Sequence, residues 1–384
     1  MHNKVNLLIV VNDPAFFVSH RLPLARRARQ EGFEVHVATG PGERVHDIEG
    51  AGLHFHRLPL QRSGRNPFQE LRLLVALLRL YRRLRPELVH LVTIKPLLYG
   101  GLIARLYRIP GTVSAVSGMG YLFTGQRKGF SRRFAESLYR LALRHRNSRV
   151  IVQNETDRAR LYEIGALREG HDVLIPGSGA DLDFFQPAPL PKTDGPPLVV
   201  LPARMLWDKG IGEFVEAARQ LAQRGIEVRC ALVGGFDDAN PARVPHEQLT
   251  AWQEDGIVEW WGHQHDIAAV YAQAHLVVLP SFYGEGLPKA LIEAAACGRA
   301  IITTDHPGCR EVVDHDRNGY LVPIKDPQRL AEAMAQLISD RERLEAFGRY
   351  SRRKAEREFG QESVIDAHLD IYQSLLDKAR EQRR

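Results

Sequence analysis

The stretch LPSFYGEGLPKALIEAAACGRAIITTD, residues 279–305, decides the fold of the second half of this 384-residue chain. It begins inside the apolar run 274–280, which predicts a buried strand. Gly286 and Pro288 then break the backbone, and the run KALIEAAACG predicts a helix that stops at Gly298. A polar loop that leads from a buried strand into a helix is where doubly wound α/β proteins bind anionic ligands.

Two carboxylates, Glu285 and Glu293, lie in this stretch. Glu285 falls in the loop and Glu293 about a turn and a half into the predicted helix, within reach of a ligand held over the helix start. Two carboxylates would repel a bare phosphate, but they accept hydrogen bonds from the hydroxyl groups of a sugar. The pattern therefore indicates a nucleotide sugar. The alternative is that both glutamates only complement the helix dipole.

The Glu-x7-Glu pattern inside SFYGEGLPKALIEAAACG resembles the signature of retaining family-4 glycosyltransferases of the GT-B fold. The segment PARMLWDKGIGEFVEAA (202–218) resembles the arginine–lysine diphosphate clamp of that family, and the runs at 231–235, 258–267 and 308–322 fit the same half. The N-terminal half resembles a subgroup that acts on lipid-linked sugars in surface-polysaccharide assembly. The segments that carry this second likeness are VNDPAFFVSHRLPLARRARQEGFEVHVAT, HLVTIKPLLYGG and AVSGMGYLFTG.

The resemblance implies an α/β chain with the GT-B fold, which has two facing Rossmann-like domains and a deep interdomain cleft. The length agrees, because 384 residues exceed the size at which a single hydrophobic core stops growing. We expect the following division: an N-terminal acceptor-binding domain at 1–185, a proline-rich linker at 186–197, a nucleotide-sugar-binding domain at 198–360, and a C-terminal helix at 361–384 that packs back on the first domain.

Apolar runs predict the strands. In the first half they lie at 4–12, 33–40, 53–59, 86–93, 111–117, 148–154 and 171–177. In the second half they are PLVVLPAR, ALVGG, VEWWG, LVVLPS, AIITTD and GYLVP. Helical patterns alternate with these runs, the first of them ending near Gln30, so we expect a parallel sheet in each half with helices on both faces.

The resemblance assigns the donor site to the second half. Arg204 and Lys209 would neutralise the diphosphate, above all the charge that develops as the leaving group departs. Glu285 would contact hydroxyl groups of the transferred sugar, and Glu293 those of the ribose. The remaining donor-binding candidates are Gly234, Gly286, Leu287 and Lys289. No cofactor and no metal are expected, because two side-chain cations would do this work.

The first half should supply the acceptor side. His90 ends one predicted strand and Lys95 follows it, so both should lie at the carboxyl edge of the sheet. The family often places a histidine there that meets the transferred sugar, and His90 therefore joins Arg204, Lys209 and Glu285 as a catalytic candidate. The acceptor-side candidates are Asn12, Phe16, His20, Lys95, Gly118 and Tyr121.

Two Asp-x-Asp motifs, at 181–183 and 314–316, have the form that glycosyltransferases of the other major fold use for a metal. The first motif enters the linker and the second lies in a turn. We expect neither to bind a catalytic metal.

The two halves of the chain carry net charges of opposite sign. Residues 1–190 contain 28 Lys and Arg against 16 Asp and Glu, a net of +12, whereas residues 191–384 contain 24 against 30, a net of −6. The predicted helices 71–85 and 130–146 mix arginine with Leu, Phe and Tyr, as helices on an anionic membrane do. Each could instead turn an apolar stripe into the core. Nucleic acid would attract the same charge, but no nucleic-acid motif accompanies it, so we expect a membrane surface as the partner.

The three cysteines, of which Cys230 and Cys297 sit in apolar runs, favour a reduced protein. The N-terminal apolar run is too short for a signal peptide or a membrane span. We therefore expect a cytoplasmic protein that associates peripherally with the inner face of the plasma membrane.

The expected function is retaining transfer of a sugar, a hexose or N-acetylhexosamine, from a nucleotide-diphosphate sugar to a lipid-linked saccharide acceptor. By family habit the donor is UDP-linked, the lipid is undecaprenyl diphosphate and the product is O-antigen, capsule or exopolysaccharide. Two alternatives stay open. A nucleotide-sugar epimerase on the same fold would need no acceptor, and a non-enzymatic membrane-surface protein would bind nucleotide weakly or not at all.

Overall fold

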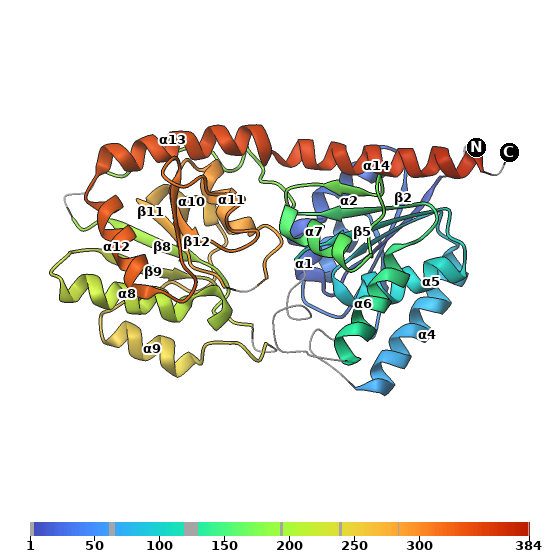
Figure 1. Cartoon of the computed structure of the whole chain (residues 1–384), viewed down its shortest axis with the longest axis horizontal. Helices are drawn as coiled ribbons and strands as arrows, with labels where there is room; N and C mark the ends of the chain where they lie inside the picture. Colours follow the sequence, from blue (N-terminus) through green and yellow to red (C-terminus); the bar gives the residue numbers. More distant parts are fainter. Residues whose placement is uncertain are drawn as a thin grey trace. The chain divides into compact units, whose positions relative to one another are not determined.

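The computed structural model describes residues 4–60, 66–118, 130–192, 195–237, 240–282, 284–382 and 384. The chain divides into two compact units (Figure 1). Unit 1 comprises Met1–Ser178 and Glu362–Arg384, and unit 2 comprises Gly179–Gln361. Each unit is built on one parallel sheet, as the alternation of apolar runs and helical patterns predicts.

The sheet of unit 1 has seven strands in the order β3-β2-β1-β4-β5-β6-β7. Their bounds are β1 (Asn6–Val10), β2 (Glu34–Thr39), β3 (His54–Arg57), β4 (Leu88–Val92), β5 (Gly111–Val116), β6 (Ser148–Val152) and β7 (Asp172–Leu174). Every expected strand of this half is present, and all pairings between the named strands are parallel. The chain moves outward from β1 to β3 and then returns to place β4 beside β1. This reversal is the topological switch point, where ligands bind in open α/β sheets.

Helices cover both faces of this sheet. They are α1 (Pro14–His20), α2 (Leu22–Gln30), α3 (Val45–Gly50), α4 (Pro67–Leu84), the π-helix η1 (Pro96–Gly100), α5 (Gly101–Leu106), α6 (Phe130–Leu143), α7 (Glu155–Glu163) and α14 (Gln361–Glu381). Side chains alternate between the faces: Leu8 and Val10 of β1 pack with α4, α5 and α6, whereas Leu7 and Ile9 pack with α2 and α14. Figure 1 shows α4, α5 and α6 on one side of the sheet and α2 and α14 on the other.

The first helical pattern forms two helices rather than one. Arg21 lies between α1 and α2 with φ −132° and ψ −13°, outside the helical range. Pro23 follows two residues later, and its missing N–H and its ring prevent the first helix from continuing through this point. The side chain of Arg21 is buried at this break.

The sheet of unit 2 has six parallel strands in the order β10-β9-β8-β11-β12-β13. Their bounds are β8 (Leu198–Pro202), β9 (Arg229–Val233), β10 (Glu259–Trp260), β11 (Leu276–Leu279), β12 (Ala300–Thr304) and β13 (Gly319–Val322). All six expected strands are present. The switch point of this sheet lies between β8 and β11, the strands that precede the two segments on which the predicted donor site depends.

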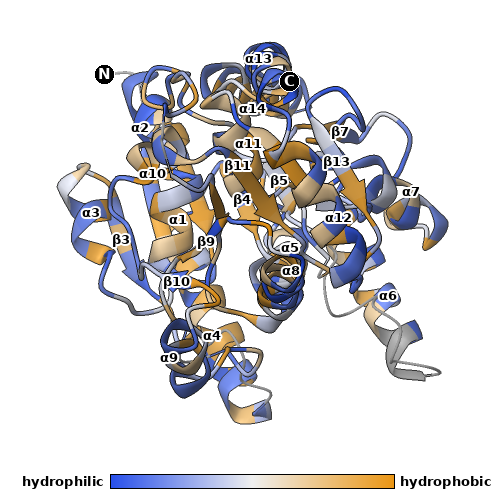
Figure 2. Ribbon diagram, turned by 90° about the vertical axis from the view of Figure 1, so that its left-hand side faces the viewer, coloured by the Kyte–Doolittle hydropathy of each residue, from blue (hydrophilic) through white to orange (hydrophobic). Residues whose placement is uncertain are grey.

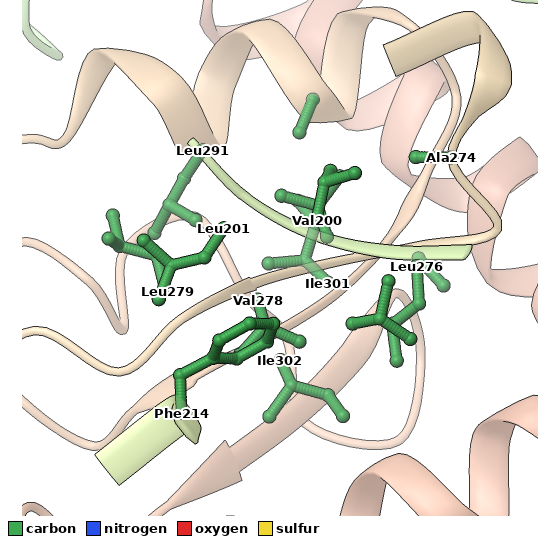
Figure 3. Close-up of a cluster of buried hydrophobic side chains, with 14 of the residues drawn as sticks. Val200, Leu201, Phe214, Ala274, Leu276, Val278, Leu279, Leu291, Ile301 and Ile302 are labelled. Atoms are coloured by element: carbon green, nitrogen blue, oxygen red, sulfur yellow. The ribbon is translucent and has the colours of Figure 1, made fainter. Parts of the chain in front are cut away.

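The helices of unit 2 enclose one hydrophobic core. They are the 3-10 turn η3 (Trp207–Lys209), α8 (Ile211–Gln223), α9 (His246–Glu254), α10 (Ile267–Gln273), α11 (Lys289–Ala296), α12 (Pro327–Ile338) and α13 (Arg341–Glu358). Figure 3 shows this core, where Val200 of β8 and Val278 of β11 lie among Phe214 of α8, Leu291 of α11 and Ile302 of β12. The central strands are buried throughout, which explains their uninterrupted apolar runs.

The boundary between the units differs from the expected one. Phe185 and Leu190 are buried in the core of unit 2, and the guanidinium of Arg341 donates to the carbonyls of Leu190 and Pro191 at 3.1 and 3.0 Å. The segment that the prolines mark as a linker is therefore packed against unit 2. At the other end, α14 buries five apolar side chains in the core of unit 1, namely Val364, Ile365, Ile371, Tyr372 and Leu375.

The arginine-rich helices use their apolar stripes in the core. Leu73, Leu77 and Leu80 of α4 are buried, as are Tyr139 and Leu143 of α6. These buried side chains face the core, as one of the two interpretations of the stripes expects, and the membrane-surface interpretation stays a prediction. Figure 2 shows strands β4, β5 and β11 as hydrophobic (orange) and helices such as α2, α9 and α13 as mostly hydrophilic (blue).

Within the described ranges, no helix combines the length and the apolar character that crossing a bilayer requires.

Candidate functional site

Two loops of unit 2 meet beside its switch point. One follows β8 and contains η3, and the other follows β11 and leads into α11. The N–H of Phe282, in the second loop, donates to the carbonyl of Asp208 in the first at 3.1 Å. The hydroxyl of Ser281 lies 3.1 Å from the same carbonyl and shares its one proton between this oxygen and Glu285. These bonds join the two loops into one surface at the carboxyl edge of the sheet.

Lys209 and Glu285 form an ion pair across the two loops. Their side chains are 16% and 15% exposed. The hydroxyl of Ser281 donates to Glu285, 3.0 Å from Oε1. Burial by itself would raise the pKa of the Glu285 carboxyl, but the Lys209 ammonium and the hydrogen bonds from Lys209 and Ser281 outweigh it and hold that pKa below its ordinary value. Glu285 is therefore an ionised acceptor held beside a fixed cation.

Glu293 lies on α11 in a different environment. Its Oε1 is 3.4 Å from the ammonium of Lys289, four positions earlier, and its Oε2 is 3.4 Å from the hydroxyl of Tyr271. Burial raises the pKa of the Glu293 carboxyl above its ordinary value, although Lys289 and Tyr271 act in the opposite direction. The carboxylate form of Glu293 is thus poorly solvated, and hydroxyl groups of a ligand would supply the donors that stabilise it.

Arg204 has an exposed side chain that forms an ion pair with Asp237, just after β9. Its charge also helps to lower the pKa of Glu285. Sequence reasoning misses Asp237, because no local pattern links it to an arginine 33 positions earlier. Both predicted cations therefore have a carboxylate partner, and an incoming phosphate group would have to replace these partners.

Two glycines hold the loops closer together than other residues allow. Gly234 has φ 154°, and a Cβ there would lie 1.8 Å from the carbonyl oxygen of Ala203. Gly308 has φ 84°, and a Cβ there would lie 2.3 Å from the carbonyl oxygen of Gly286. Larger residues at either position would push apart the loops that form the site.

The start of α11 offers backbone donors. The helix begins at Lys289 after the N-cap Pro288, which makes no side-chain cap hydrogen bond. The first N–H groups of a helix have no partner within it and favour an anion. The side chain of Leu287 is 8% exposed and packs in the core, so this donor-site candidate can offer a ligand only its backbone.

Cys309 lies close to Glu285 but does not act as a nucleophile in this arrangement. Burial, followed by the charge of Glu285, raises the pKa of its thiol to about 12. Cys230 and Cys297 are likewise free, buried and held at a pKa of about 12, mainly by burial. All three thiols are therefore protonated at neutral pH.

The two Asp-x-Asp motifs have structural partners. Oδ1 of Asp181 accepts hydrogen bonds from the N–H groups of Asp183 and Phe184, both at 3.0 Å. Asp314 pairs with Lys354 at 2.7 Å. Among the described residues, no group of three or more His, Cys, Asp or Glu side chains is placed to hold a metal ion.

The acceptor-side candidates that the structure describes follow β1, β4 and β5, in loops or on α1. Phe16 and His20 stack on α1 with ring centroids 4.1 Å apart. The carbonyl of Asn12 accepts a hydrogen bond of 3.1 Å from the N–H of Gly40. Gly118 follows β5 with φ 90°. Tyr121 lies outside the residues that the structure describes.

The loop after β4 is strained and polar. Thr93 has φ 71°, which a β-branched residue rarely adopts, and the π-helix η1 follows directly. Both features are concentrated at functional sites. Lys95 pairs with Glu70 of α4, 2.7 Å from Nζ to Oε1. Burial, followed by Glu70, raises the pKa of the neighbouring Tyr99 to about 12. Sequence reasoning finds Lys95 but misses Glu70 and Tyr99, which only the tertiary structure brings to it.

The prediction that His90 lies at the edge of the sheet is wrong. His90 is in β4, is fully buried and points to the face that α14 covers. Its Nδ1 is 2.6 Å from the hydroxyl of Tyr372, and its ring stacks on His368 at 5.6 Å. Burial, followed by the nearby charge of Arg21, holds the pKa of His90 well below its ordinary value. A neutral histidine enclosed in the core cannot contact a transferred sugar.

Two protein-family models match the chain. The model of "Glycosyl transferase 4-like" proteins matches residues 6–154, and that of "Glycosyl transferases group 1" matches residues 183–354. The first match covers the sheet of unit 1 up to β6, and the second covers the whole sheet of unit 2.

Individual relatives agree with the family models. The chain is 29% identical over 333 residues to the N,N'-diacetylbacillosaminyl-diphospho-undecaprenol alpha-1,3-N-acetylgalactosaminyltransferase of Campylobacter jejuni, which covers 83% of this chain and 86% of that protein. It is 21% identical over 376 residues to the capsular polysaccharide biosynthesis glycosyltransferase CapM of Staphylococcus aureus, covering 94% and 96%.

Among solved structures, the chain resembles Anabaena Alr3699/HepE in complex with UDP. The TM-score is 0.76, at 19% identity, over 97% of this chain and all of the other. At this identity the likeness concerns the fold. It is the GT-B arrangement of two Rossmann-like domains, each with its own switch point.

Proposed function

This chain belongs to the glycosyltransferases that join a glycosyl transferase 4-like half to a group 1 half, and we propose that it transfers a sugar from a nucleotide-diphosphate sugar to a lipid-linked saccharide. The observation that carries the proposal is the set of charges at the switch point of unit 2. Two cations, Lys209 and Arg204, are held there by carboxylates, beside the uncapped start of α11. This arrangement suits a diphosphate that bears hydroxyl groups on both sides.

The donor would be bound by exchange of partners. The diphosphate replaces Asp237 at Arg204 and Glu285 at Lys209, and Glu285 then accepts hydrogen bonds from the transferred sugar. Glu293 accepts them from the ribose, which relieves the poor solvation of its carboxylate. We propose a uridine nucleotide, a choice supported by the UDP complex of the structurally similar Anabaena protein.

The chemistry in this proposal is charge neutralisation and positioning. As the bond between sugar and diphosphate breaks, the negative charge grows on the leaving phosphate, and Lys209 and Arg204 stabilise it. The acceptor hydroxyl enters from the same face, loses its proton to the leaving phosphate and yields a product with retained configuration. Two fixed cations take the part of a metal, so we propose that the transfer is metal-independent.

The acceptor is proposed to be an undecaprenyl-diphosphate-linked saccharide in the synthesis of bacterial surface polysaccharide. The printed names of the Campylobacter and Staphylococcus relatives support this class. In unit 1 the residues offered to the acceptor are those of the strained loop after β4, where the ammonium of Lys95 can meet a phosphate. His90 is left out of this set because it is buried.

A lipid-linked acceptor places the enzyme at a membrane. The first turns of α4 expose two apolar side chains three positions apart, Phe68 at 78% and Leu71 at 59%, on the unit that carries the positive charge. We propose that these side chains enter an anionic membrane surface, on the inner face of the plasma membrane. Phe68→Ser/Leu71→Ser should reduce co-sedimentation with vesicles that contain anionic phospholipid. Undiminished co-sedimentation would remove this contact from the proposal.

The test of the transfer is an assay with the purified chain. A panel of uridine, guanosine and thymidine diphosphate sugars is offered with an undecaprenyl-diphosphate-linked sugar, and the lipid product is read by mass. A gain of one sugar residue from one donor supports the proposal and identifies that donor. Conversion of a nucleotide sugar without any lipid product would support an epimerase instead. If no donor gives either product, the proposed class of acceptor is the first part of the proposal that this result contradicts.

A further inference from the structure

A groove with a volume of about 350 Å³ lies in unit 1, at the edge of the sheet opposite to the acceptor-side candidates. It is formed where α4 connects to β4 and α5 connects to β5. These strands are neighbours, with Leu88 paired to Gly111, so the two connections lie side by side. Arg85 and Glu87 line the groove from the first connection, and Tyr107 and Arg108 from the second.

Both arginines have an unfavourable backbone conformation. Arg85 has φ 45° and Arg108 has φ 51°, in the left-handed region that glycine and asparagine adopt more easily. Arg85 is the C-cap of α4, and Arg108 follows the C-cap of α5. The left-handed backbone conformation therefore occurs twice in one groove, and both residues that adopt it are arginines.

The guanidinium groups of Arg85 and Arg108 are exposed, and no described residue forms a hydrogen bond or an ion pair with either. Arg105, one turn before Arg108, shows what a structural arginine does here. It donates to the carbonyls of Leu141 and Arg144 at 3.1 and 2.7 Å. The side chains of Arg85 and Arg108 form no comparable hydrogen bonds to described residues.

Hydrogen bonds fix the walls of the groove. Oε2 of Glu87 accepts from the N–H of Asn6 at 2.9 Å, and Oε1 of the same carboxylate forms no bond to a described residue. The side-chain amide of Asn147 donates to the carbonyl of Pro110 at 2.7 Å and to that of Leu375 at 2.8 Å. The groove is thus formed before any ligand arrives.

From these observations we infer that the groove binds a small phosphate ester that carries hydroxyl groups, such as a sugar phosphate. Two unpaired guanidinium groups hold the phosphate, because their planar donors match its oxygens. The free oxygen of Glu87 accepts from a hydroxyl group, and the half-exposed ring of Tyr107 covers the apolar side of the ligand. The volume is at the small end of the range for ligand pockets, about 300 to 1,000 Å³.

The test uses the full chain with Arg204→Ala and Lys209→Ala in every protein, so that the switch-point site of unit 2 contributes no phosphate binding. Glucose 1-phosphate is titrated by calorimetry against this protein and against the same protein with Arg85→Asn and Arg108→Asn. Asparagine tolerates the left-handed conformation, so the melting temperature should stay the same or rise. The affinity should fall at least tenfold. Arginines that only complement the helix dipoles would give an unchanged affinity, which overturns the site.

Two further variants test the specificity. Arg82→Gln with Arg146→Gln removes the same charge from exposed positions outside the groove, and the affinity should not change. If this control lowers the affinity as much as the change of Arg85 and Arg108 does, the ligand is attracted by charge alone, and the site is overturned. Glu87→Gln should weaken glucose 1-phosphate and spare inorganic phosphate. If glucose 1-phosphate and inorganic phosphate bind the unaltered groove with equal affinity, and Glu87→Gln changes neither affinity, the inference that the ligand is a phosphate ester is overturned. Absence of any binding overturns the whole inference.

Discussion

Lys209 and Glu285 lie 76 positions apart in the sequence and form an ion pair between the loops that follow β8 and β11. The pair holds a cation where the leaving diphosphate would depart, and it keeps a buried carboxylate ionised. Its two members depend on each other, because removal of either leaves the other charge poorly compensated. The following predictions begin from this pair.

Lys209→Ala should lower turnover about 100-fold, because it removes a preorganised cation from the developing charge. Circular dichroism should show the same fold. Arg204→Ala should act in the same direction. The matched control is Arg329→Ala, which removes an exposed cation of α12 that pairs with Glu332. Undiminished turnover in both site variants would exclude the diphosphate clamp.

Glu285 should make the stability depend on pH in acid. Its pKa is lower in the folded chain than in the unfolded one, so the stabilisation is present above the ordinary pKa and is lost as the pH falls through the folded value. Glu285→Gln removes this contribution. Urea unfolding of the two proteins should therefore differ most near pH 7 and converge as the pH falls below 4. A difference that does not change with pH would contradict the depressed pKa.

Glu293 should have the opposite effect. Its folded pKa is raised by burial, so its ionisation costs stability at neutral pH and costs nothing once the pH is below the ordinary value. Glu293→Gln should unfold at a higher urea concentration at pH 7, and the gain should vanish near pH 4. It should also bind UDP about tenfold more weakly, as the loss of one hydrogen bond to a charged acceptor predicts. Tighter or equal binding would remove Glu293 from the donor site.

A cluster of histidines at the edge of unit 1 should weaken the protein in mild acid. Burial, followed by the charge of His36, lowers the pKa of His56 to about 4. His56 lies 3.1 Å from His36 and 3.1 Å from the guanidinium of Arg83, which gains nothing from a protonated neighbour. Nearby, His54 stacks on His36 and pairs with Glu34.

Because the pKa of His56 is lower in the folded chain than in the unfolded one, the free energy of unfolding should be highest above pH 6.5 and should decrease as the pH falls toward 4. His56 is only half-buried, so the expected loss is about 1 kcal/mol after allowance for solvent screening. Urea unfolding at pH 7 and pH 4.5 measures it. His56→Gln should flatten this dependence, and the exposed His46→Gln should leave it unchanged. Equal slopes for both variants would contradict the role of His56.

Tyr372→Phe should cost stability and spare catalysis. The variant removes the hydrogen bond of 2.6 Å to His90 and leaves a buried ring nitrogen without a partner, which costs about 1 to 3 kcal/mol. The melting temperature should fall, while kcat and KM for the donor stay within twofold. A large loss of kcat at an unchanged melting temperature would show that the His90 region contributes to catalysis after all.

The sequence predicts the elements well because their signals are local. The thirteen strands of the two sheets come from apolar runs, of which the central ones, such as β8, β11 and β12, are buried on both faces. The glycine and proline around 284–298 mark the loop and the ends of α11 correctly. Arg204, Lys209 and Glu285 lie in the loops after β8 and β11 for a similar reason. Parallel strands end at one edge, so the loops after β8 and β11 must meet there.

Contacts between distant segments could not be predicted in this way. The sequence predicts that His90 ends a strand at the sheet edge. The alternation of side chains along β4 instead turns it toward α14, which brings Tyr372 from 282 positions away. The pairing of Arg204 with Asp237 and that of Lys95 with Glu70 join different loops and helices. The expected linker contains Leu190, whose burial in unit 2 no proline pattern reveals.

The sequence by itself determined the fold class, the two sheets and the residues that meet at the switch point of unit 2, because these depend on periodicity, helix termini and strand direction. Only the tertiary structure decided which charges neutralise each other, that His90 belongs to the core, and that Arg85 and Arg108 face one groove. The reason is that these relations are set by packing between segments far apart in the chain, where the direction of a side chain depends on which helix covers its strand.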